Sequence, residues 1–137
     1  MVVASIGPWG TNPVSAILAK YANPFRESLA NMSSTDKIAG LREILALDAK
    51  SSFARYGIAM ELAGRGDSED ALKEFDLLLA NDPDYTAAYF MSAQTLANIG
   101  RKNEAIERLK GGISCAARTG NRHALSEMQT MLDELDR

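Results

Sequence analysis

The sequence predicts an all-α fold in which pairs of helices stack side by side as an α-α superhelix, or solenoid. Three observations carry this prediction. The chain of 137 residues repeats itself at an offset of 34 residues. Apolar residues within each repeat recur at helical spacing, and glycines stand where one helix must end and the next begin. A period of this size is typical of stacked helical repeats, because a lone helix pair leaves apolar flanks exposed.

The repeat is visible when segments 34 residues apart are compared. Leu41, Leu45 and Asp48 align with Phe75, Leu79 and Asp82. The following segments align in the same register, with the pairs Leu62/Leu96, Gly66/Gly100, Ala71/Ala105 and Phe75/Leu109. Because several residues agree at one offset, the repeat is a property of the whole region and not of one short match.

One period reads as a helix, a turn and a second helix. Ile58 and Leu62 are four residues apart, which places them on one helical face. Gly66 follows, and glycine tolerates the left-handed geometry of a helix end. In the next helix, Ala71 is small where two helices cross closely, and Phe75 fills the space one turn later.

This pattern resembles the tetratricopeptide repeat, a helix–turn–helix of 34 residues. Ser52–Tyr85 resembles one repeat and Thr86–Thr119 a second, while residues 35–50 resemble the second helix of an earlier repeat whose first helix is missing or replaced. About two and a half repeats are therefore expected. The chain departs from the pattern at Arg55, where an aromatic residue is usual, and at Ala117, which replaces the closing proline.

The resemblance implies a concave groove lined by the first helix of each repeat, in which extended peptides or helices bind. The groove residues expected in this chain are Phe53, Tyr56, Met60 and Ala63 from one repeat and Ala87, Phe90, Gln94 and Asn98 from the next. The alternative is that some of these side chains only pack the array. An apolar, aromatic groove suits a hydrophobic peptide or an amphipathic helix. Tyr56 and Met60 stand where the family's groove for chaperone peptides has lysine and asparagine.

The last part of the chain predicts a longer helix and a cap. Gly111-Gly112 predicts a bend in the second helix of the second repeat, which then continues through Ala117. Thr119-Gly120-Asn121 ends this helix, and a capping helix is expected over 121–136. Its polar face carries Glu127, Asp133, Glu134 and Asp136.

Residues 1–31 are read separately from the repeat domain at 32–137. They hold three of the four prolines and leave room for one short helix, with Ile17, Leu18 and Tyr21 on one face. Either this segment is an assembly arm that covers the open apolar end, in the same chain or the next, or the native chain begins at Met32. The segment lacks the basic start and unbroken apolar stretch of a secretory signal, so we expect a cytoplasmic protein.

Charge is uneven along the chain, whose net charge is −3. Residues 61–84 hold eight acidic and two basic side chains, a net charge of −6, and residues 101–122 hold six basic and two acidic ones, a net charge of +4. This is either an ordinary solvated surface or a pair of opposite ends that favour head-to-tail contact between copies. The overall acidity and the lack of interleaved aromatics argue against nucleic-acid binding.

Little in the sequence supports catalysis. His123 is the single histidine, with no ligand cluster nearby, so no metal site is expected. Cys115 is interpreted as a buried small residue; a Cys–His nucleophile pair would lack an orienting third group. No cofactor motif and no membrane-length apolar run occurs. We therefore expect a non-catalytic protein-binding module, or alternatively a structural protein whose copies assemble with one another.

Overall fold

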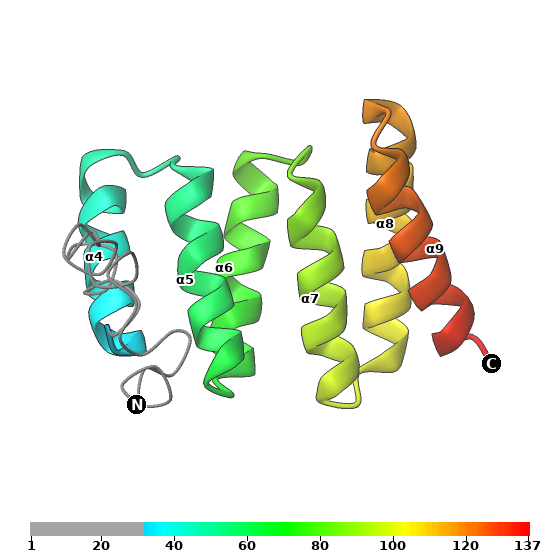
Figure 1. Ribbon diagram of the computed structural model, residues 1–137, viewed down its shortest axis with the longest axis horizontal. Coiled ribbons are helices and arrows are strands. Elements are labelled where there is room, and N and C mark those ends of the chain that lie inside the picture. The colour runs from blue at the N-terminus through cyan, green and yellow to red at the C-terminus, as the bar shows by residue number, and fades with distance from the viewer. Residues whose placement is uncertain (1–31) are drawn as a thin grey trace, which may run out of the picture. The chain divides into compact units, whose positions relative to one another are not determined.

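The computed structural model describes residues 32–137, which form six helices and no strand (Figure 1). The expected helix of the segment 1–31, with Ile17, Leu18 and Tyr21, lies outside the described residues. In the described part, the helices are α4 Ser34–Leu47, α5 Ser52–Gly64, α6 Ser68–Asn81, α7 Thr86–Asn98, α8 Lys102–Thr119 and α9 Arg122–Leu135. The predicted all-α solenoid is confirmed.

Each helix packs against the next one along the chain, and α7 also contacts both α5 and α9. The first helices of the two pairs and the capping helix therefore share one layer. The second helices, α6 and α8, form the other layer behind it. No helix within residues 32–137 has the length and apolar character needed to span a bilayer.

Local signals set the ends of the helices. The side chain of Ser33 accepts a hydrogen bond from the backbone N–H of Asp36 at 3.1 Å, which satisfies an otherwise unpaired donor of α4. Gly66 lies in the turn between α5 and α6, and Gly100 lies in the turn between α7 and α8. Their φ angles are 88° and 81°. Glycine adopts this left-handed backbone without a steric cost, so the chain can turn within three residues.

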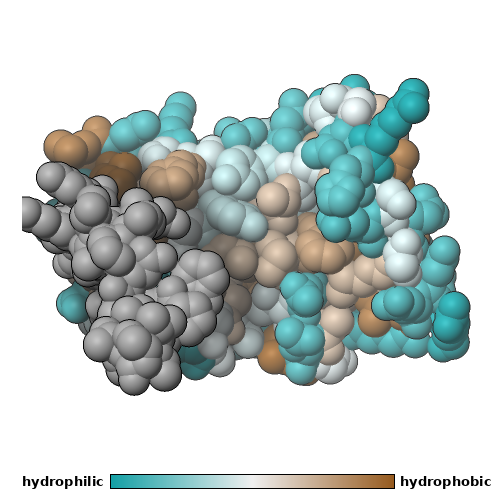
Figure 2. All heavy atoms as spheres, viewed as in Figure 1, coloured by the Kyte–Doolittle hydropathy of each residue, from teal (hydrophilic) through white to brown (hydrophobic). Residues whose placement is uncertain are grey.

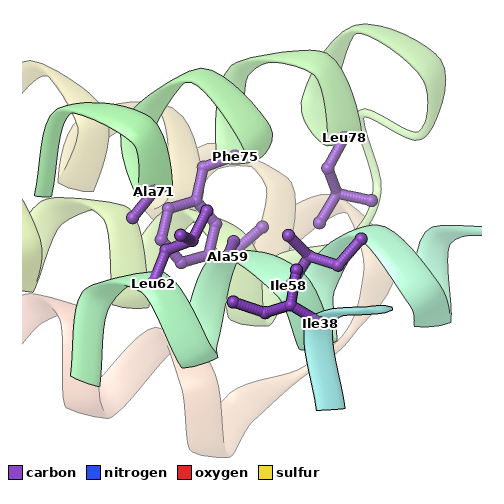
Figure 3. Packing of buried hydrophobic residues seen from close by; sticks show 8 residues of the cluster. Ile38, Ile58, Ala59, Leu62, Ala71, Phe75 and Leu78 are labelled. Carbon is purple, nitrogen blue, oxygen red and sulfur yellow. The ribbon is translucent and has the colours of Figure 1, made fainter. Parts of the chain in front are cut away.

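The core of the first pair is built from small and large side chains that alternate between α5 and α6 (Figure 3). Ile58, Ala59 and Leu62 of α5 meet Ala71 and Phe75 of α6, and all five are buried. Burying a side chain as large as Phe75 or Ile58 contributes about 1.5–3 kcal/mol each. A second cluster joins α7, α8 and α9 around Ala93, Leu96, Ala105, Leu109 and Met128.

Gly112 has a packing role that the sequence did not reveal. Helix α8 runs without interruption across Gly111-Gly112 to Thr119. Gly112 is buried, and a Cβ atom added there would lie 2.6 Å from Cβ of Tyr89 and closer still to the sulfur of Met128. The missing side chain is what allows α7 and α9 to approach α8 at this point.

The acidic and basic segments pair with each other inside one chain. Three ion pairs connect α6 and the loop after it to α8 and its start: Glu69 with Arg101 at 2.9 Å, Asp76 with Arg108 at 2.6 Å and Asp84 with Arg118 at 2.6 Å. The hydrogen bond from Arg118 holds the pKa of Asp84 below its usual value. The interpretation that the two segments form opposite ends of the molecule is therefore wrong. Residues one repeat apart occupy neighbouring second helices, so their charges meet.

Arg55, which departs from the repeat pattern, takes part in an ion cluster that joins α4, α5 and α6. Its guanidinium lies 2.9 Å from the carboxylate of Glu74 on α6, and Arg42 of α4 lies 3.7 Å from the other oxygen of that carboxylate. Arg55 also donates to the carbonyl of Ala49 at 3.2 Å. The ion pair thus replaces the aromatic contact expected at this position.

Candidate functional site

The predicted groove residues belong to α5 and α7, which share one layer with α9. Figure 2 shows hydrophobic side chains gathered over α7 and between α7 and α9, with hydrophilic side chains around them. A groove of about 490 Å³ lies between these two helices. Its length follows the helix axes, because its lining residues recur every three or four positions.

Helix α7 lines one wall of this groove with three of the predicted residues. Phe90, Gln94 and Asn98 are spaced four apart, which places them in one row along the helix. Phe90 is partly buried against the second core cluster, while Gln94 and Asn98 are exposed. The row therefore offers an aromatic ring followed by two carboxamides that can donate and accept hydrogen bonds.

Helix α9 lines the opposite wall, and sequence reasoning did not assign it to the groove. The wall consists mainly of His123, Glu127, Met131 and Glu134. Their spacing of four, four and three residues is the signal that could have identified them, because it continues along one face of a helix. Met131 packs on the core and forms an apolar floor together with Phe90.

The predicted residues of α5 lie apart from the α7–α9 groove. Phe53 is 71% exposed at the start of the helix. Tyr56 is partly buried, with its ring centroid 6.3 Å from that of Phe75 and 5.2 Å from that of Tyr85. Met60 is also partly buried against the first core cluster. Tyr56 and Met60 thus pack against the first core cluster, and each still presents part of its surface.

The pKa of Tyr56 reflects this partial burial. Burial raises its pKa above the usual value of 10, and the neighbouring Tyr85 raises it further. A phenol in this setting stays neutral, so Tyr56 contributes an apolar ring and a hydroxyl to the face and no charge.

Of the remaining predicted positions, Ala63 is partly buried on the first core cluster and Ala87 is exposed at the start of α7. Neither lines the α7–α9 groove.

The α7–α9 groove carries two carboxylates, of Glu127 and Glu134, that no lysine or arginine of residues 32–137 pairs with. Nε2 of His123 lies 3.2 Å from Oε1 of Glu127, and this contact is an ion pair only when the imidazole is protonated. No lysine or arginine lines the groove, and Glu134 has no basic partner within the described part of the chain. The groove therefore combines an apolar floor with an amide and carboxylate rim.

A second groove, of about 610 Å³, lies on the other layer, between α6 and α8. Leu72 and Leu96 contribute apolar surface to it. Its charged rim is balanced within the chain, since Asp76 pairs with Arg108 and Arg101 pairs with Glu104. It offers fewer uncompensated charges to a partner than the α7–α9 groove does.

The two residues with nucleophile or metal-ligand chemistry have separate environments. Cys115 is buried, and its sulfur lies 3.6 Å from the carbonyl oxygen of Pro83 and 3.7 Å from the hydroxyl of Thr86. His123 is exposed and contacts Glu127. Across residues 32–137, no three acidic, histidine or cysteine side chains group in a way that could hold a metal ion.

Known proteins share both the sequence pattern and the helical arrangement. No protein-family model matches the chain. A TPR repeat-containing protein of Pseudomonas aeruginosa is 28% identical over 100 residues, which cover 73% of this chain and 95% of that protein. A tetratricopeptide repeat domain protein from Salinibacter ruber, known as a solution structure, is 30% identical with a TM-score of 0.61, over 64% of this chain and 89% of that one.

A more distant structure extends the fold comparison. The TPR2B domain of yeast Sti1, solved in complex with an Hsp70 peptide, superposes with a TM-score of 0.73 at 15% identity. The match covers 81% of this chain and 89% of that domain. At this identity, the likeness shows the fold alone.

Proposed function

Because the chain belongs to the tetratricopeptide repeat family, we propose that it is a non-catalytic protein-interaction module. It holds an apolar peptide or an amphipathic helix of another protein against the face of α5, α7 and α9. The fold relative from yeast, whose structure contains a bound peptide, supports a role of this kind.

The observation that carries the proposal is the groove between α7 and α9. Phe90 and Met131 give it an apolar floor on which a buried side chain of a partner can rest. Gln94 and Asn98 stand beside this floor with exposed carboxamides. An apolar patch with polar groups at its edge is the usual arrangement of a peptide-binding surface, in which the floor supplies affinity and the edge supplies orientation.

Position-specific photo-crosslinking tests the proposal. A photoreactive phenylalanine analogue is placed at Gln94, which faces the groove, and at Asn103, which lines the groove of the other layer. In cells that make the full chain, we expect a discrete adduct from position 94 and none from position 103. The adduct should disappear when Phe90→Ala is added, with helicity by circular dichroism as the check on folding.

Other outcomes are equally informative. An adduct at position 103 alone, or one at position 94 that survives Phe90→Ala in a folded protein, would place the partner elsewhere. An adduct of twice the mass of the chain would instead identify a second copy as the occupant and support the self-assembling alternative.

A further inference from the structure

We infer that the α7–α9 groove selects a basic amphipathic segment, whose apolar side chains rest on Phe90 and Met131 and whose lysine or arginine side chains meet Glu127 and Glu134. This inference rests on the proposed function and specifies the chemistry of the partner.

On the face of α5, α7 and α9, the candidate site residues become more polar and then acidic from α5 to α9. The predicted residues of α5 are Phe53, Tyr56 and Met60, which carry no charge. Helix α7 adds the carboxamides of Gln94 and Asn98. Among the residues that line the α7–α9 groove, the acidic ones all come from α9. A partner that spans the face therefore meets an apolar end and an anionic end.

The carboxylates of α9 differ from most acidic side chains of the neighbouring α6–α8 groove. There, Asp76 and Glu104 are neutralised by Arg108 and Arg101. Glu127 faces only His123, and Glu134 faces no cation of the described chain. Two carboxylates beside an apolar floor repel an acidic partner and favour a cationic one, because complementary charge both steers association and excludes partners of the wrong sign.

A second copy of the chain has few free cations to offer in its most basic segment, residues 101–122. Four of the six basic residues there are already paired with acids of their own chain, namely Arg101, Arg108, Lys110 and Arg118. The cations are therefore expected from a different protein.

Binding of synthetic helical peptides to the full chain tests the inference. Three labelled peptides of the length of α7 share one leucine face and carry lysine, glutamine or glutamate on the other face. We expect the lysine peptide to bind most tightly by fluorescence anisotropy and the glutamate peptide to bind least. Added salt should reduce the difference between them, because screening weakens exposed charge pairs.

A matched pair of variants locates the effect. Glu127→Gln with Glu134→Gln removes two charges from the groove. Asp133→Asn with Asp136→Asn removes one charge from α9 and one from the residue that caps it, both outside the groove. The net charge of the protein is the same in both variants. We expect the groove variant to bind the lysine peptide about tenfold more weakly, and the control to stay within about twofold of the parent protein.

Equal losses in the two variants would mean that net charge alone attracts the peptide, and no loss in either would mean that α9 takes no part; both results overturn the inference. So would a glutamine peptide that binds as tightly as the lysine peptide. In each of these cases, a crosslink from position 94 that depends on Phe90 would leave the proposed function intact. Loss of that crosslink would reject the function itself.

Discussion

At the scale of single residues, Gly112 shows how close packing overrides local preference. Alanine normally stabilises a helix interior by about 1 kcal/mol relative to glycine. At position 112, however, the added methyl group would lie 2.6 Å from Cβ of Tyr89. The backbone of α8 would have to move away from α7 and α9 to accept it.

We therefore expect Gly112→Ala to lower the free energy of unfolding by about 1–3 kcal/mol, as overpacked sites do. Gly40→Ala is the matched control, because Gly40 is also within a helix and no atom of residues 32–137 lies within 4 Å of the added Cβ. It should raise stability by about 0.5–1 kcal/mol. Urea denaturation of both variants checks this, and equal effects of the two substitutions would contradict the packing role of Gly112.

Glu74 is a second residue whose contacts join neighbouring helices. Its carboxylate is 12% exposed and lies between Arg55, which is 16% exposed, and Arg42. Glu74→Gln keeps the shape and removes the charge, so two guanidinium groups lose their counter-ion. We expect a loss of about 1.5–3 kcal/mol in the free energy of unfolding.

Glu43→Gln provides the comparison for this change, because Glu43 is an exposed residue of α4. It should alter stability by less than about 0.5 kcal/mol. Thermal and urea unfolding would measure both variants. If Glu74→Gln proved as mild as Glu43→Gln, the ion pair across α4, α5 and α6 would not stabilise the array.

At the scale of helices, α4 is less supported than its equivalents in the later repeats. Helix α6 packs between α5 and α7, and α8 packs between α7 and α9, whereas the backbone of α4 packs only on α5 among the helices of residues 32–137. The ion pair of Arg42 with Glu74 adds a side-chain contact to α6. Ile44 corresponds to Leu78 at the 34-residue offset. Ile44 is 39% exposed and Leu78 is 1% exposed.

This difference predicts unequal opening along the array. In hydrogen–deuterium exchange followed by mass spectrometry, backbone amides of α4 should exchange earlier than those of α6, because few buried contacts oppose local opening of α4. Equal protection of α4 and α6 would contradict this prediction and would indicate a further contact on α4.

At the scale of the whole molecule, repetition determined how much could be predicted. Residues that recur every 34 positions, such as Phe75 and Leu109, are core residues because each occupies the same place in its pair, and both are fully buried. The positions of the helices and turns follow from the same markers. A periodic sequence therefore specifies stacking and order well.

Contacts that depend on a departure from the pattern could not be predicted in this way. Gly112 and Arg55 break the repeat, and their roles depend on which side chains of other helices meet them. The candidate site was predicted on one wall only. Phe90, Gln94 and Asn98 could be predicted because the first helices of the two repeats are equivalent. Glu127 and Glu134 belong to the capping helix. Its packing against α7 is a tertiary contact that the repeat pattern does not specify.

The central proposal is that the layer of α5, α7 and α9, and not the layer of α6 and α8, receives a partner. Chemical-shift mapping of the isotope-labelled full chain with the lysine peptide measures this directly. We expect the largest changes at Phe90, Gln94 and Glu127. Changes centred on Asn103 and Arg108, or spread evenly over both layers, would contradict the proposal.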